Sequence, residues 1–110
     1  DGQARSFIIA GGPGIGPAVG IGERALADGN AVSIIYRTDA PAHGERLAGI
    51  DANGGTVIIT EEDLAGPIAD TRTGDEQVFI YGFQPFVTAA IAALEAAGGS
   101  PDAAMIENFG

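Results

Sequence analysis

Five short apolar segments alternate along the chain with segments that have a helical pattern. The apolar segments are residues 6–10, 31–36, 56–60, 77–81 and 103–107, and the helical ones are residues 17–28, 43–50, 67–71 and 85–97. Short continuous apolar runs are typical of strands that are buried on both faces, as in a parallel sheet. With right-handed crossovers, the alternation predicts an α/β fold: a doubly wound, five-stranded parallel sheet with helices on both faces.

The length of the chain allows one domain. Its 110 residues can bury one sheet with covering helices, but not two separate cores, so we expect a single domain over residues 1–110. In open parallel sheets of this kind, ligands bind beyond the carboxyl ends of the strands. The loops that follow the strands are therefore the places where we expect chemistry.

The chain is strongly acidic. It carries 15 Asp and Glu residues against 5 basic residues, all of them Arg, for a net charge of −10. A surface of this sign repels a phosphate backbone, so nucleic acid is disfavoured as a partner. Many carboxylates without any Lys also favour a halophilic protein, because salt screens the repulsion between them.

Several other classes are disfavoured by what the sequence lacks. It has no Cys, and hence no disulfide, thiolate metal site or Cys nucleophile. No apolar run approaches the ~18 residues of a membrane span, and no signal peptide is visible, so we expect a cytoplasmic protein. Because the chain begins at Asp1 rather than Met, we interpret it as an excised domain or a processed product.

A glycine-rich loop, residues 11–17 (Gly-Gly-Pro-Gly-Ile-Gly-Pro), lies between the first expected strand and the first expected helix. Amides at a helix start form an anion site, and glycines let a phosphate come close to the backbone. No Gly-Lys-Ser/Thr follows, Pro17 stands where a dinucleotide fingerprint has its third Gly, and Tyr36-Arg37 closes the second strand without an acid. The loop predicts an unusual phosphate site, with a plain strand-to-helix turn as the alternative.

The same loop, read as Gly-Gly-x-Gly-Ile-x-Pro, is the first of a series of motifs that follow in order. The others are residues 34–38 (Ile-Ile-Tyr-Arg-Thr), 57–63 (Val-Ile-Ile-Thr-Glu-Glu-Asp), 66–70 (Gly-Pro-Ile-Ala-Asp), 78–87 (Val-Phe-Ile-Tyr-Gly through Pro-Phe-Val) and 107–110 (Glu-Asn-Phe-Gly). In this order they resemble the NAD(P)H-binding domain of ferredoxin–NADP⁺ reductase-like flavoproteins, in particular NADH-using oxygenase reductases and electron-transfer subunits of dihydroorotate dehydrogenase. The resemblance covers nearly the whole chain.

The resemblance implies an oxidoreductase domain. NADH or NADPH would lie across the strand ends and pass a hydride to a flavin, FAD or FMN. The flavin would be held by a β-barrel on another domain or subunit, which this chain lacks, and an iron–sulfur electron-transfer protein would be a further partner. The chain alone would be an incomplete enzyme. The implied dinucleotide-binding residues are Gly11, Gly12, Gly14, Ile15, Gly16, Pro17, Gly82 and Phe83.

Three residues near expected strand ends are the catalytic candidates. The resemblance implies that Phe109 lies by the flavin ring and that Glu107 is the acidic group beside it. Tyr81 stands where the family has a Cys close to the transferred hydride. We interpret Tyr81 either as a ring that stacks on the cofactor or as a strand-end tyrosine with a hydrogen-bonded hydroxyl.

Arg37 and the acidic residues 61–63 are further cofactor-binding candidates. Arg37 would meet a phosphate or the adenine face, or form a surface ion pair with Asp39. Glu61, Glu62 and Asp63 are too closely clustered for a catalytic or metal site. They follow the third strand, where NADP-using members of the family read the 2′-phosphate with a Ser-Arg pair, and therefore predict a preference for NADH.

Two alternatives to this interpretation remain. One is a non-catalytic nucleotide-binding or interaction module of the same fold, and the other is an unrelated flavodoxin-like or receiver-like fold. A receiver would need an acidic residue at the end of the first strand, where Ala10-Gly11 stands.

We interpret His43 as a solvent-facing residue near a helix start rather than a proton shuttle. We expect Gly14→Val to abolish dinucleotide binding and leave the fold unchanged.

Overall fold

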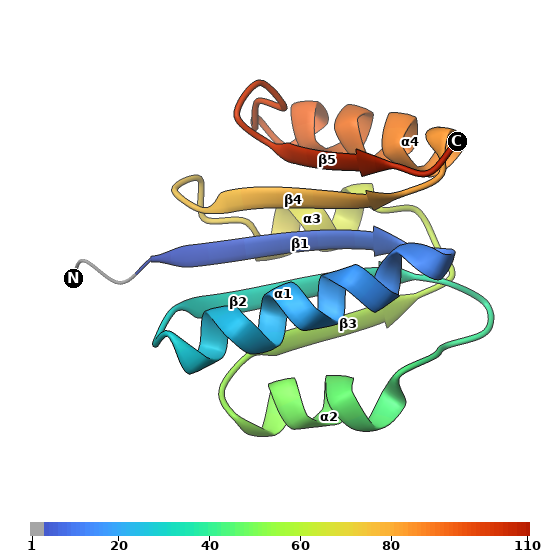
Figure 1. Cartoon of the computed structure of the whole chain (residues 1–110). Coiled ribbons are helices and arrows are strands. Elements are labelled where there is room, and N and C mark those ends of the chain that lie inside the picture. Colours follow the sequence, from blue (N-terminus) through green and yellow to red (C-terminus); the bar gives the residue numbers. More distant parts are fainter. Residues whose placement is uncertain (1–3) are drawn as a thin grey trace.

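The computed structural model, which describes residues 4–110, contains one five-stranded parallel sheet (Figure 1). Its strands are β1 (Arg5–Gly11), β2 (Ala31–Arg37), β3 (Thr56–Thr60), β4 (Gln77–Gly82) and β5 (Met105–Asn108), in the spatial order β3-β2-β1-β4-β5. The helices are η1 (Gly12–Gly14), α1 (Ile15–Ala27), α2 (Gly44–Ala52), α3 (Ala65–Thr71) and α4 (Gln84–Ala96). The predicted fold class is confirmed.

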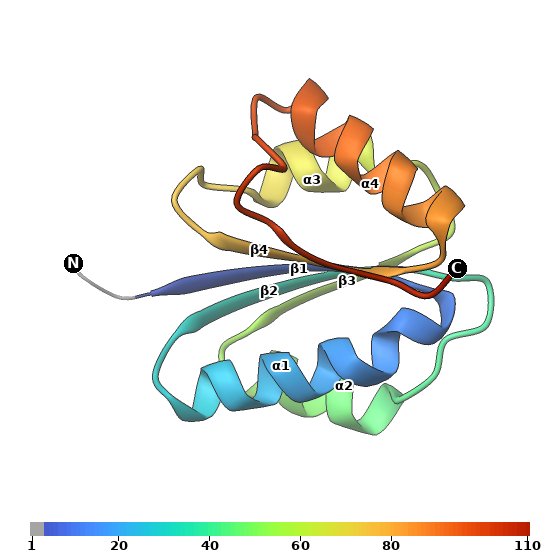
Figure 2. The same ribbon diagram turned by 45° about the horizontal axis from the view of Figure 1, so that its top comes forward.

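The helices lie in two layers, with α1 and α2 on one face of the sheet and α3 and α4 on the other (Figure 2). Side chains along a strand alternate between the two faces. In β1, Ile8 and Ala10 therefore pack under α1, whereas Phe7 and Ile9 pack under α4. All four are almost fully buried, which explains why the strand is apolar throughout rather than alternating.

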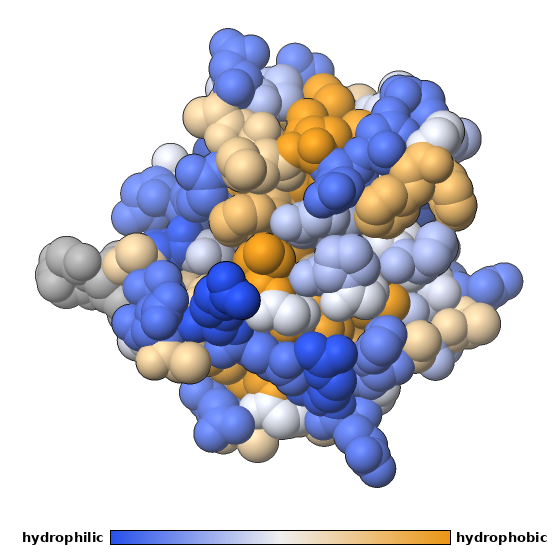
Figure 3. Space-filling view, viewed as in Figure 1, coloured by the Kyte–Doolittle hydropathy of each residue, from blue (hydrophilic) through white to orange (hydrophobic). Residues whose placement is uncertain are grey.

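The strands differ in how well they are covered. On the face that carries α1 and α2, these helices lie over β1, β2 and β3 and cover Tyr81 near the end of β4, but they leave the beginning of β4 and all of β5 open (Figure 1). The edge strand β5 is exposed along its whole length, and Met105 keeps 60% of its surface accessible. Seen from the same side, the surface over β4 and β5 shows apolar residues among polar ones (Figure 3).

Small differences separate the predicted element bounds from the observed ones. Helix α1 begins at Ile15, two residues before the expected start, because the glycine loop winds directly from η1 into the helix. Strand β5 begins at Met105 rather than at residue 103, because the preceding residues form a turn in which the Ala104 N–H donates to the Pro101 carbonyl, 3.0 Å away. Asp1, on which the interpretation of an excised chain depends, lies outside the described residues.

Within residues 4–110, no helix is long and apolar enough to cross a membrane.

Candidate functional site

The carboxyl ends of all five strands lie at one edge of the sheet, and the glycine loop is at its centre. Strand β1 leads into η1 and then into α1 with a positive φ of 51° at Gly12. In the described part of the chain, no side chain caps the start of α1 and no acidic residue lies in its first turn. The positive end of the helix dipole is thus available to an external anion.

An open groove of about 270 Å³ lies beside this loop. It is lined by Gly11, Gly12, Pro13, Arg37, Phe83, Pro85 and Phe86. The lining combines glycine backbone, one cation and two aromatic rings. Small-molecule sites usually combine mostly apolar walls with a few polar groups.

Phe86 is the side chain around which the groove is built. A Cβ on Gly11 would lie 2.4 Å from its ring and a Cβ on Gly82 would lie 2.7 Å from it, so both glycines are needed to seat the ring. The Arg37 guanidinium carbon is 5.1 Å from the ring centroid, in the range of a cation–π contact. Phe86 therefore orients Arg37 at the edge of the groove.

The glycines of the loop have different roles. A Cβ on Gly12 would meet nothing within 4 Å, so this residue leaves the groove wall open. A Cβ on Gly14 would lie 2.3 Å from the backbone carbonyl oxygen of Tyr81. The expectation that Gly14→Val changes binding alone is therefore wrong: Gly14 is needed for the loop to pack against β4, and a side chain there would disturb the fold.

Tyr81 and Glu107 lie opposite one another in the β4–β5 register, on the sheet face that carries α1. Tyr81 is buried, and Phe86 packs on the other face of the sheet. Burial raises the pKa of the Tyr81 phenol above its ordinary value, and the nearby Glu107 carboxylate raises it further. Tyr81 is therefore a neutral hydroxyl at physiological pH.

Phe83 and Phe109 meet at the end of β4 and β5. Their ring centroids are 6.1 Å apart and the rings are nearly perpendicular, at 81°. The Phe109 N–H donates to the Gly82 carbonyl oxygen at 2.9 Å and so continues the pairing of the two strands. Phe83 retains 48% and Phe109 38% of its surface exposed, which leaves two accessible aromatic rings at this edge.

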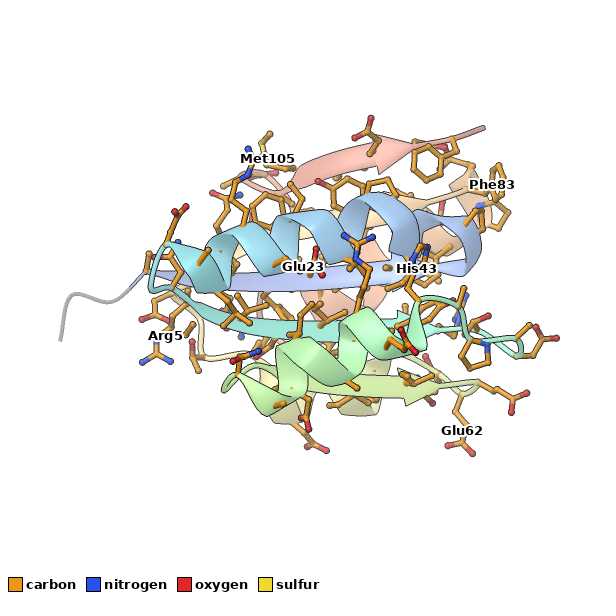
Figure 4. All side chains as sticks on the ribbon, turned by 60° about the horizontal axis from the view of Figure 1, so that its bottom comes forward. Arg5, Glu23, His43, Glu62, Phe83 and Met105 are labelled. Atoms are coloured by element: carbon orange, nitrogen blue, oxygen red, sulfur yellow. The ribbon has the colours of Figure 1, made fainter. Side chains whose placement is uncertain are left out.

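The acidic residues 61–63 form a turn directly after β3. Their side chains are exposed, and Glu62 projects into solvent (Figure 4). The Glu62 N–H donates to Thr60 Oγ1 at 3.0 Å, and the Ala65 N–H donates to the Asp63 carboxylate at 3.3 Å. Asp63 thus also supports the start of α3. The turn lies next to Arg37, since Arg37 and Thr60 are register partners, but outside the lining of the groove.

His43 is exposed and directly precedes α2, as expected for a solvent-facing residue near a helix start. Its φ of 59° is in the left-handed region. A Cβ on Gly16 would lie 3.9 Å from its Nε2, which puts the imidazole beside the first turn of α1.

Phe86, Pro13 and Pro85 line the groove but are not among the binding residues expected from the sequence. For Phe86 a signal exists: an aromatic residue four positions after Gly82, in the first turn of the following helix, must lie at the carboxyl edge. The signal is easily missed because an apolar residue in an Ala-rich helix is usually core. Phe86 belongs to the core and also lines the groove, since it is buried in the α4 layer and faces the groove.

A larger hollow of about 610 Å³ lies between α1 and α2, away from the strand ends. Arg46 and Glu23 form an exposed ion pair across it, and the hydrogen bond from Arg46 lowers the pKa of Glu23. This hollow brings together no set of groups with a shared chemistry.

Two solved structures share the fold of the whole chain. A flavohemoglobin from Malassezia yamatoensis, with bound FAD and heme, matches 100% of this chain and 33% of its own at a TM-score of 0.73 and 19% identity. A cytochrome P450 reductase from Amycolatopsis matches 99% of this chain and 38% of its own at a TM-score of 0.74 and 20% identity. No protein-family model and no curated protein matches the sequence.

The chain spans only 33% and 38% of the length of these two proteins. At such low identities the likeness establishes the fold. It is the doubly wound α/β fold that the resemblance of the ordered motifs implied.

Proposed function

We propose that this ferredoxin reductase-like chain is the NADH-binding domain of a flavoprotein oxidoreductase. The observation that carries the proposal is the cradle at the centre of the carboxyl edge. There, an uncapped helix start and the open Gly12 backbone adjoin a groove that is lined by Arg37 and two aromatic rings. This combination of an anion site with an apolar slot fits a dinucleotide.

The strand order suggests how the dinucleotide lies. Strand β1 is central, with β2 and β3 on one side and β4 and β5 on the other. With the pyrophosphate on the loop of Gly12 and Gly16, the adenosine half would extend toward Arg37 and residues 61–63. The nicotinamide half would extend toward Gly82 and Phe83. Both halves would then have partners of suitable chemistry: a cation with polar groups for one, and flat rings for the other.

The bound nicotinamide would supply the hydride, and a flavin on another domain or subunit would accept it. The chain's own part is to bind the dinucleotide and to border the ring with Phe83, Phe109 and the neutral Tyr81. Tyr81 cannot act as a thiol, so its contribution would be packing and a hydroxyl hydrogen bond. Without its flavin partner, the chain would bind NADH and transfer no hydride.

The preference for NADH over NADPH is argued from charge at the end of β3. A 2′-phosphate near residues 61–63 would meet carboxylates, and each close like-charge pair costs about 1 kcal/mol in water. A carboxylate can instead accept hydrogen bonds from the free 2′-hydroxyl of NADH. Arg37 is the one nearby cation among the described residues of this edge, and it is already stacked on Phe86.

We therefore expect the 110-residue chain to bind NADH about fivefold or more tightly than NADPH at low salt, measured by calorimetric titration. Glu61→Arg should raise the affinity for NADPH selectively. Glu95→Arg, which makes the same charge change at an exposed site near the far end of α4, is the matched control and should not. Tighter binding of NADPH by the parent at low salt would refute the assignment.

The non-catalytic module of the same fold is the second candidate. It is favoured by Tyr81 at the position where the resemblance leads one to expect Cys. If the parent chain binds neither NADH nor NADPH, this second function replaces the first.

A further inference from the structure

A closed set of hydrogen bonds links the first turn of α4 to residues 108–110, which include the end of β5. The backbone N–H of Gln84 donates to the Gly110 carbonyl at 2.9 Å, and Asn108 Nδ2 donates to Gln84 Oε1. The Gly110 N–H donates to Asn108 Oδ1 at 3.0 Å, and Gln84 Nε2 donates to Thr88 Oγ1 at 2.9 Å. The side-chain amides of Gln84 and Asn108 thus each use both their oxygen and their nitrogen.

These hydrogen bonds hold the two chain neighbours of Phe109. The residue lies between Asn108 and Gly110, its N–H is held by the Gly82 carbonyl, and its ring stands edge-on against Phe83. Both rings are well exposed, so burial in the core does not fix their positions. A ring on an exposed segment after a strand would otherwise exchange between rotamers on a fast timescale.

We infer that Gln84 and Asn108 are positioning residues, a clamp that holds the Phe109 ring against Phe83 and so sets the wall at which the nicotinamide ring binds. The inference rests on the proposed function, because the wall matters only if a nicotinamide lies there. The clamp touches no part of the ligand. It acts by fixing a ring before the ligand arrives, which lowers the ordering cost of binding.

Gln77 offers a matched control for this clamp. Its Nε2 donates to the Ala103 carbonyl at 2.9 Å, so it too ties the segment around β5 to β4 through one exposed glutamine. It does so at the amino edge of the sheet, at the other end of β4 from Gly82. A general loss of β5 anchoring would therefore follow from Gln77→Ala as well as from Gln84→Ala.

The first measurement reports the ring itself. The chain contains no Trp, so Phe109→Trp introduces a single indole emitter at the clamped position. In this background, Gln84→Ala and Asn108→Ala should each lower the fluorescence anisotropy of the introduced indole and increase its quenching by acrylamide, whereas Gln77→Ala should not. Unchanged anisotropy and quenching in both clamp variants would overturn the inference.

The second measurement separates the two halves of the ligand. ADP-ribose carries the adenosine and pyrophosphate but no nicotinamide. With Phe109 retained, Gln84→Ala and Asn108→Ala should weaken NADH binding about three- to tenfold, the range of one net hydrogen bond, and leave ADP-ribose binding unchanged. An equal loss for both ligands, no loss for either, or tighter NADH binding would contradict a positioning role.

The outcomes also distinguish this inference from the function on which it rests. If the parent binds neither NADH nor ADP-ribose, the proposed function fails and the clamp loses its ligand, while the indole fluorescence still decides whether the ring is held. If the parent binds both and the clamp variants behave like Gln77→Ala, the proposed function stands and the clamp is rejected.

Discussion

Gly14, at the end of η1, and Gly16, in the first turn of α1, lie two residues apart, yet the structure gives them different surroundings. A Cβ on Gly14 would meet the Tyr81 carbonyl at 2.3 Å, whereas the nearest atom to a Cβ on Gly16 is His43 Nε2 at 3.9 Å. We expect Gly14→Ala to destabilise the chain by about 1–3 kcal/mol, because backbone must move to admit the methyl group. Gly16→Ala should change stability by less than about 1 kcal/mol. Urea denaturation of both variants measures the difference, and equal stabilities would contradict the described loop packing.

At the residue scale, the sequence predicted the glycine loop because its signal is local. Glycines and prolines in a fixed order between a strand and a helix can be recognised without knowledge of the fold. The seat of Phe86 could not be predicted in this way. Gly11 and Gly82 lie far apart in the sequence, at the ends of β1 and β4, and only the pairing of these strands brings both of them against one ring.

At the scale of elements, α1 shows how a helix approaches the sheet closely. Gly22 faces the strands, and a Cβ there would contact Ile34 Cδ1 at 3.1 Å and Ile50 Cδ1 at 3.3 Å. Gly20 is exposed on the same helix, and a Cβ there would meet nothing within 4 Å. The close packing that a third glycine provides in the usual dinucleotide fingerprint is thus supplied here further along the helix, by Gly22.

We therefore predict opposite effects of filling the two glycines of α1. Gly20→Ala should stabilise the chain by about 0.5–1 kcal/mol, because alanine is the better helix former and nothing opposes the methyl group. Gly22→Val should destabilise it by about 1–3 kcal/mol, because the larger side chain is forced against the two isoleucines. Thermal melting by circular dichroism gives both values. A stabilising Gly22→Val would show that α1 does not lie against the sheet as described.

Element types are easier to predict than element ends. The buried strands are visible as apolar runs, and α1 and α4 as long periodic segments. The sequence pattern starts β5 two residues too early because Ala103 and Ala104 are apolar, although the turn around Pro101 still holds them. For α3 the pattern indicates one turn from residue 67, because Pro67 resembles a first helical residue, whereas the helix starts at Ala65.

For the whole molecule, charge is the property that the sequence predicts most directly. A net charge of −10 on 110 residues makes the folded state repel itself, and dissolved salt screens that repulsion. We expect the melting temperature to rise between low and molar potassium chloride, by about 4–8 °C for each kcal/mol gained. Chloride is the appropriate anion, since sulfate also strengthens apolar burial. A flat or falling melting temperature would argue against adaptation to salt.

The fold class could be predicted from the alternation of strands and helices. The arrangement of the candidate binding residues on the two sides of the glycine loop could not. Which strand lies beside which decides that Arg37 and residues 61–63 share one side of the loop, and Phe83 and Phe109 the other. That order, β3-β2-β1-β4-β5, depends on long-range pairing that no local pattern in the sequence encodes. The proposed orientation of the dinucleotide rests on it.

Titration of NADH into three proteins shows whether a dinucleotide binds in the cradle at Gly12. Gly12→Asn adds a side chain to the groove wall at a positive φ that asparagine tolerates. Gly29→Asn makes the same change beyond the far end of α1, also at positive φ and with no atom within 4 Å of the added Cβ. We expect the parent and Gly29→Asn to bind NADH equally, and Gly12→Asn, still folded, to bind it at least about tenfold more weakly. Equal affinity of the folded Gly12→Asn variant and the parent would contradict binding in the cradle at Gly12.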